Sequence, residues 1–219
     1  MTKTRIDFRF IQIEYELWAI GQFLDIVEPQ IKFLTDQDPL RTFAKLRAGS
    51  YDDADIDFAT QELRERKKYV IPRFMRGSFL VALWACYEAG ITELAAYRQS
   101  EIGAKIDINE LRAGDFLSRA RRYFDAVLST SLDLIPERLS RLSDTYQVRN
   151  AFAHANGQQG AMSEKAWRRL EPALKRLGIP PDQSRGSGLV IPSETFLRQA
   201  FDDANGSLRA LMARLRGSP

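Results

Sequence analysis

The sequence predicts an all-α protein, a bundle of seven or eight helices in a single domain over residues 1–219. Apolar residues recur at spacings of three and four along most of the chain, which is the period of a helix with one buried face. Serine, aspartate and proline begin these stretches, and glycine ends them. The segment Leu189–Ile191 leaves room for at most one very short β-hairpin near the C-terminus. Residues 1–70 are expected to form an N-terminal helical extension, and residues 70–215 the core.

The composition is that of an ordinary folded protein. Hydrophobic residues make up 44% of the chain and charged residues 28%, so disorder is not expected. The net charge is +3, and arginine dominates the basic side, which suits forked contacts with phosphate. This composition favours RNA or another phosphate-bearing partner. The alternative is a solvated surface that happens to be rich in arginine.

Several features indicate a cytoplasmic protein. The only cysteine, Cys86, excludes an intrachain disulfide and a cysteine-based zinc site, and its apolar setting is typical of a buried structural thiol. Residues Met1–Asp7 contain no apolar core, so no signal peptide is expected. The longest apolar run, Phe79–Tyr87, is nine residues, well short of the roughly 20 needed to span a bilayer.

The first third of the chain reads as three helices. A long amphipathic helix runs from Arg5 to about Leu34, and Pro29 is expected to kink it or end it. A short helix should run from Asp38 to about Arg47. Next comes an acidic patch (Asp52, Asp53, Asp55 and Asp57), which lacks the glycine and terminal glutamate of a calcium loop. We interpret it as a solvated loop that caps a helix over residues 57–69.

A central helix is expected over residues 72–97. It is apolar on all sides between Phe79 and Tyr87, so it should be buried on more than one side. Arg76 and Glu88 flank this run, and each charge needs a partner there. Two interpretations remain: an internal brace, or a glutamate that holds Arg149 in position.

The remaining helices follow from their caps. A helix over Asp115–Leu128 carries Arg119, Arg121 and Arg122 on its solvent side. The others are expected at residues 131–155, ended by Gly157, at residues 163–177, begun by Ser163, and at residues 193–215.

The end of the helix at residues 131–155 holds the only histidine of the chain. Ile135, Leu139, Leu142 and Tyr146 define an apolar stripe that, continued at 100° per residue, is centred on Ala153. Arg149 borders this stripe on one side, and Asn150 and His154 on the other. Val148 and Phe152 lie on the opposite face, so the helix should bury two surfaces. Polar groups beside a packing seam must find partners or take part in chemistry.

These three polar residues suit metal-independent cleavage of RNA. An imidazole can take the proton of a 2′-hydroxyl, and arginine is a permanent cation for the charge that develops at phosphorus. Asn150 lies one turn before His154 and could orient the ring or the phosphate. One imidazole cannot easily serve as base and acid, which gives a physical reason for a dimer. The structural alternative is that His154 caps its helix while Arg149 pairs with Glu88.

Other chemistries find no support, because the chain has no Gly-x-Ser-x-Gly elbow, Walker loop or dinucleotide fingerprint.

The pattern Arg149-Asn150-x3-His154, at the end of a helix in an α-bundle, resembles the HEPN superfamily, which carries an Arg-polar-x(3–5)-His motif. The similarity covers about residues 70–215, and the acidic residue of the central helix, Glu88, also matches.

The resemblance implies a metal-independent endoribonuclease without a cofactor, often a toxin or defence effector, that acts as a homodimer with both motifs at one cleft. It implies catalytic roles for Arg149, Asn150 and His154 and a supporting role for Glu88. Arg76, Arg121 and Arg122 are the further arginines expected to contact RNA. Degenerate members only bind RNA or a partner protein, which is the alternative. Members controlled by a nucleotidyltransferase antitoxin carry a tyrosine shortly after the histidine, and residues 155–157 contain none.

Overall fold

The computed structural model describes residues 7–36, 52–112, 114–132, 135–180 and 188–217, and the chain is all-α there, as predicted. These residues form seven α-helices: α1 (Phe8–Asp36), α3 (Asp53–Glu65), α4 (Ile71–Ile102), α5 (Phe116–Ala126), α6 (Pro136–Ala155), α7 (Glu164–Arg176) and α8 (Glu194–Arg216). No strand forms in this part of the chain. One isolated antiparallel bridge joins Gln158 to Gly188, so the expected hairpin is reduced to a single pair. The helix expected at residues 38–47 lies outside the described residues.

The longest feature of the fold is an unbroken helix from α3 into α4. A π-helical turn, Arg66–Val70, connects the two, and the amide of Ile71 donates to the carbonyl of Arg66. The sequence predicts a break in the helix before Pro72, because proline has no amide hydrogen to donate. This break is absent, since the wider π turn continues the helix past the proline. The predicted boundary at residue 70 falls within this helix. α3 contains no buried residue among those described, and its Phe58 is exposed.

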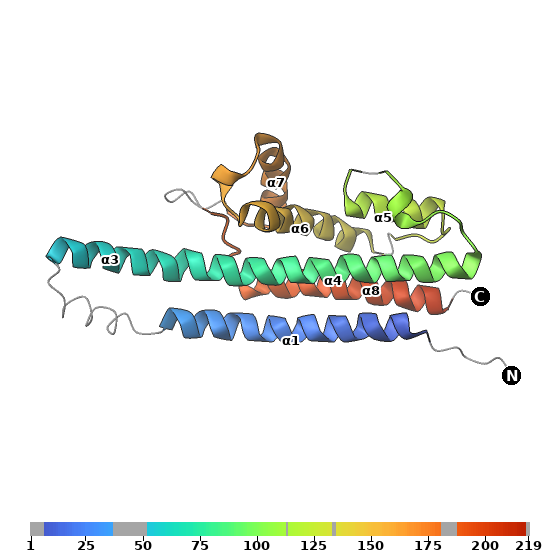
Figure 1. Ribbon diagram of the computed structural model, residues 1–219, viewed down its shortest axis with the longest axis horizontal. Helices are drawn as coiled ribbons and strands as arrows, with labels where there is room; N and C mark the ends of the chain where they lie inside the picture. Colours follow the sequence, from blue (N-terminus) through green and yellow to red (C-terminus); the bar gives the residue numbers. More distant parts are fainter. Residues whose placement is uncertain (1–6, 37–51, 113, 133–134, 181–187, 218–219) are drawn as a thin grey trace.

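Three long helices form the base of the molecule, with α1, α4 and α8 side by side (Figure 1). α1 continues past Pro29 to Asp36, so the alternative that this proline ends the helix is wrong. Its inner face adds seven buried side chains to the common core: Phe10, Ile13, Leu17, Ile20, Leu24, Val27 and Ile31. The opposite face is also apolar and lies exposed, with Phe8, Ile11, Tyr15, Trp18 and Phe33 along it.

α6 packs against α4 and α8 and is held by one close approach and by an ion pair to a buried carboxylate. A Cβ atom added at Gly77 of α4 would lie 2.3 Å from Cδ1 of Phe152, so glycine allows the two helices to come together. At the contact between α6 and α8, the guanidinium of Arg141 donates to the buried carboxylate of Asp203 at 2.7 and 2.5 Å. α6 thereby has a fixed position against the central helix.

The apolar stripe predicted around Ala153 is confirmed in part, because Leu142 is buried and Leu139 and Tyr146 pack half-buried against the core. Its predicted centre is wrong. Ala153 and Ile135 are exposed, and α6 buries the face that carries Leu142, Val148 and Phe152. Val148 and Phe152 contact the core, because the large apolar side chains of the neighbouring helices lie on that side of α6. Tyr146 and Arg149 remain half-buried at the edge of the core. Small Ala153 therefore borders solvent and not a helix–helix seam.

The predicted helix caps are confirmed, but most of the acidic patch expected as a loop lies within α3, which begins at Asp53 and not near residue 57. The side chains of Asp52, Ser163 and Ser193 accept the backbone amides of Asp55, Ala166 and Phe196, and that of Asp115 accepts the amide of Ser118. Such bonds satisfy amides that have no partner within the helix. α6 ends at Ala155, followed by Asn156 and Gly157 with φ of 49° and 71°, where glycine carries no steric cost.

One helix of the described part, Ala54–Ile102, contains a window long and apolar enough to cross a membrane. Half of that window is buried inside the fold. The core helix of a soluble protein meets the same criteria, so this window is weak evidence for a membrane span.

Candidate functional site

The motif occupies the last two turns of α6, and its arginine is held from the side of α4. A guanidinium nitrogen of Arg149 lies 3.9 Å from a carboxylate oxygen of Glu88. Another donates to the side-chain oxygen of Asn150 at 3.0 Å. The indole of Trp84 fixes the same glutamate by donating to it at 2.8 Å. The predicted Glu88–Arg149 pair is therefore present, and the hydrogen bond from Trp84 orients its carboxylate.

This arrangement leaves part of the Arg149 guanidinium available. The side chain is 18% exposed and that of Glu88 28%, so the pair lies at the surface edge of the core. The Arg149 group also lies 6.0 Å from the ring centre of Tyr146, which adds a weak cation–π contact. Its buried Nε has no hydrogen-bond partner within the described residues. An incoming phosphate could therefore contact only the exposed part of the guanidinium and not this buried Nε.

His154 lies on the other side of α6, in a hollow against α7. The hollow has a volume of about 280 Å³, and its polar lining residues are Gln147, Asn150, His154, Ser163 and Arg169. Ala151, Met162, Ala166 and Leu170 are among the apolar residues that complete it. The imidazole is exposed, and the described part of the chain offers it no hydrogen bond or ion pair. Arg169 was not singled out from the sequence, since nothing in α7 alone indicates that it faces the histidine.

Asn150 connects the two sides of the motif. Arg149 and His154 are five residues apart, so their side chains leave the helix about 140° apart. No contact between these two side chains is present in the part of the chain that the structure describes. Asn150 lies between them, bonds the guanidinium of Arg149 and lines the hollow of His154. Within one chain, the cation and the imidazole therefore border a shared surface without touching.

Arg76 has a structural role in place of the expected RNA contact. Its guanidinium binds Glu28 of α1 at 2.6 and 2.9 Å and donates to the carbonyl of Ile191 at 2.7 Å. These bonds join α1, α4 and the segment before α8. All three of its nitrogens are used within the fold, so a contact with RNA would have to replace one of these bonds.

Arg121 and Arg122 are not brought to the motif either. Both are exposed on α5, as predicted, but α5 packs against the C-terminal part of α4, where Tyr123 donates to the carbonyl of Ile106. The motif lies at the opposite end of α6, beside α7 (Figure 1). The separation between α5 and the motif cannot be read from the sequence.

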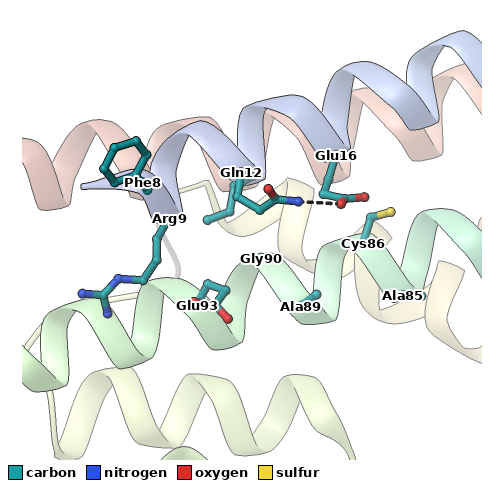
Figure 2. A pocket seen from close by; sticks show the side chains of 10 residues that line it. Phe8, Arg9, Gln12, Glu16, Ala85, Cys86, Ala89, Gly90 and Glu93 are labelled. Carbon is teal, nitrogen blue, oxygen red and sulfur yellow. Dashed lines mark hydrogen bonds between the residues drawn. The ribbon is translucent and has the colours of Figure 1, made fainter. Parts of the chain in front are cut away.

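A second hollow, of about 620 Å³, lies between α1 and α4. Figure 2 shows Cys86 of α4 and Glu16 of α1 on its walls, with Gln12 bonded to Glu16. Burial, and then the charge of Glu16, raise the pKa of the Cys86 thiol, which favours the unreactive protonated form. The thiol is half-buried and not fully buried as expected, and it lies on the side of α4 that faces α1.

Removing the charge of Glu88 tests the Arg149 pair. We expect Glu88→Gln to lower RNA cleavage about tenfold or more, because the amide keeps the bond from Trp84 but no longer attracts the guanidinium. The melting temperature should fall only slightly, since a 3.9 Å pair that is partly exposed contributes about 1 kcal/mol or less. Cleavage rates and thermal unfolding check both expectations. In the double variant Glu88→Gln with Arg149→Met, stability should recover but activity should not. Unchanged cleavage by Glu88→Gln alone would exclude a role of Glu88 in positioning Arg149.

The comparisons with known proteins add no relative. No family model matches the chain, and no curated protein or solved structure matches it significantly. Any functional assignment therefore depends on the residues of the site and on their chemistry.

Proposed function

We propose that the protein is a metal-independent endoribonuclease of the HEPN type. One observation supports the proposal: the end of α6 presents an oriented guanidinium, a carboxamide and an imidazole with no partner among the described residues, on adjoining surfaces. Each has a role in 2′-hydroxyl attack. The imidazole of His154 takes the 2′-hydroxyl proton, the 2′-oxygen attacks phosphorus, and the bond to the 5′-oxygen breaks. The products are a 2′,3′-cyclic phosphate and a 5′-hydroxyl.

The roles of the other two residues follow from their contacts. Arg149 binds the non-bridging phosphate oxygens as negative charge grows on them, and Glu88 keeps it aimed outward. Asn150 receives one bond from Arg149 and can donate its amide hydrogens towards the hollow. It can thereby set the position of the phosphate relative to the imidazole.

A homodimer completes the reaction in this proposal. The leaving 5′-oxygen needs a proton, and one imidazole that has just acted as base is not free to supply it as a separate acid. A second chain with its own His154 supplies that proton if the two motifs share a cleft. The half-buried edge of Tyr146, Arg149 and exposed Ala153 is a surface on which such a partner can lie.

The alternative is a non-catalytic helical module that binds RNA or a partner protein. One observation favours it: Arg149 is bonded to Glu88 and Asn150 and does not contact His154 in the described part of the chain. In that reading the motif braces α6 against α4. The two readings differ in whether substitution of His154 has any effect on RNA.

The cellular role that fits the activity is a toxin or defence effector in the cytoplasm. An antitoxin or another component of a defence system would then restrain it. The absence of a tyrosine at residues 155–157 argues against control by nucleotidyl transfer to that position.

Cleavage in the presence of a chelator tests the chemistry. We expect RNA cleavage to survive EDTA, because the mechanism uses an imidazole and a guanidinium in place of a Lewis acid. The fragments should carry 2′,3′-cyclic phosphate, which mass spectrometry distinguishes from a 3′-hydroxyl. Activity that is lost with EDTA and restored with magnesium would exclude this mechanism.

A further inference from the structure

The hollow between α6 and α7 contains a cation to which the described residues offer no partner. Arg169 lies on its wall, and within the described residues its side chain has no ion pair or hydrogen bond. The neighbouring arginines of α7 differ. Arg168 pairs with Glu164, and Arg176 binds Asp144 at 2.8 and 2.6 Å. Arg169 is thus an uncompensated positive charge on the same wall as the histidine.

The shape and lining of the hollow restrict what can enter it. A volume of about 280 Å³ lies at the lower end of the range of small-molecule pockets, so it admits a group the size of one nucleoside and no duplex. Met162 and the small alanines give it an apolar part. The carboxamides of Gln147 and Asn150 carry both donors and acceptors, which can bond the edge of an unpaired base.

The position of His154 relates this hollow to the reaction. Its imidazole borders the same space as Arg169, whereas Arg149 approaches from the other side of α6. A nucleotide in the hollow would have the imidazole and the guanidinium of Arg169 on its walls. The proposed function puts the scissile phosphate at Arg149, so the phosphate left for Arg169 is the adjacent one.

We propose that this hollow is a subsite for one unpaired RNA nucleotide next to the scissile phosphate, with Arg169 as its phosphate ligand and Gln147 as a contact to its base. The inference rests on the proposed ribonuclease function and specifies its substrate as single-stranded RNA. Arg169 binds substrate and takes no part in proton transfer.

Binding measurements separate this subsite from the chemistry. The probe is a short single-stranded 2′-O-methyl RNA, which lacks the attacking hydroxyl and cannot be cut. Arg169→Gln should raise its Kd about tenfold, the effect of losing one charged hydrogen bond. The slope of log Kd against log salt should fall by about 0.7, as for one phosphate contact to a single strand. A blunt RNA duplex should bind more weakly and show no response to the substitution.

Arg168→Gln is the matched control, because it removes the same charge from the adjacent position but outside the hollow. It should leave Kd and the salt slope close to those of the wild type. Equal effects of the two substitutions would overturn the subsite, as would an equal response with the duplex. If the wild type cleaves RNA and Arg169→Gln behaves as Arg168→Gln, only the subsite fails. If Arg169→Gln weakens binding but the wild type cleaves nothing, the subsite stands and the ribonuclease proposal fails.

The single histidine supplies a second measurement. The imidazole proton signals of His154 are the only ones in the spectrum of the full chain, so they report on the hollow without assignment. They should shift when the 2′-O-methyl RNA is added, and less so in Arg169→Gln at equal RNA concentration. Binding that leaves these signals unmoved would place the RNA elsewhere and overturn the proposal.

Discussion

His154→Ala should abolish RNA cleavage, lowering the rate by about 100-fold to 10,000-fold, the contribution of a general base. The stability should hardly change. The imidazole is exposed and has no partner in the described part of the chain, and exposed substitutions of this kind change the free energy of unfolding by about 0.5 kcal/mol or less. Cleavage of labelled single-stranded RNA and thermal unfolding of the same samples measure the two effects.

Ser143→Ala is the control for this substitution, since it changes an exposed residue of α6 away from the hollow. It should retain full activity. A His154→Ala protein that cleaves at the wild-type rate would remove the ribonuclease proposal and favour the non-catalytic module. One that unfolds would show that the imidazole is structural.

Arg141→Met should cause the largest loss of stability among single substitutions in the ion pairs that hold α6. The carboxylate of Asp203 is 3% exposed, and the substitution removes its two shortest bonds. Arg138 at 3.7 Å and Gln199 at 3.3 Å remain, so we expect a loss of about 3 kcal/mol, at the lower end for a broken buried pair. In a chain of this size that corresponds to a fall in Tm of about 6–12 °C.

The control is Arg198→Met on α8, whose side chain is about half exposed and pairs with Asp25 and Glu194, both also exposed. Surface pairs of this kind contribute about 0–1 kcal/mol, so its Tm should fall by no more than about 4 °C. Adding Asp203→Leu to Arg141→Met should recover part of the loss, because the buried carboxylate is then no longer left without its main partner. Similar Tm values for the two single variants would contradict the importance of the buried carboxylate.

The helices could be predicted because local signals define them. Ser163, Ser193 and Asp115 begin their helices as expected, and α6 ends before Gly157. What a local pattern cannot give is which apolar face a helix buries when two faces are apolar. In α1 the exposed stripe looks as hydrophobic as the buried one, and only the packing against α4 and α8 decides between them.

The same limit applies to the site. The Glu88–Arg149 pair could be predicted, since a charge next to the buried run of α4 needs a partner. Arg76 was assigned to RNA because its partner, Glu28, lies 48 positions earlier and no periodicity relates the two. Arg169 could not be found from the sequence for the converse reason: its place on the wall of the hollow arises from the packing of α7 on α6, which depends on the intervening turn at Asn156 and Gly157.

The long helix of α3 and α4 is supported very unevenly along its length. The turns of α4 around Trp84 and Ile91 are enclosed on several sides, and their backbone hydrogen bonds can open only when the whole domain unfolds. The 13 residues of α3 project beyond this support, with no buried side chain among those described. A helix of that length is marginal in water without tertiary contacts. The described contacts therefore predict a lower free energy of opening for α3 than for the segment of the same continuous helix beneath the motif.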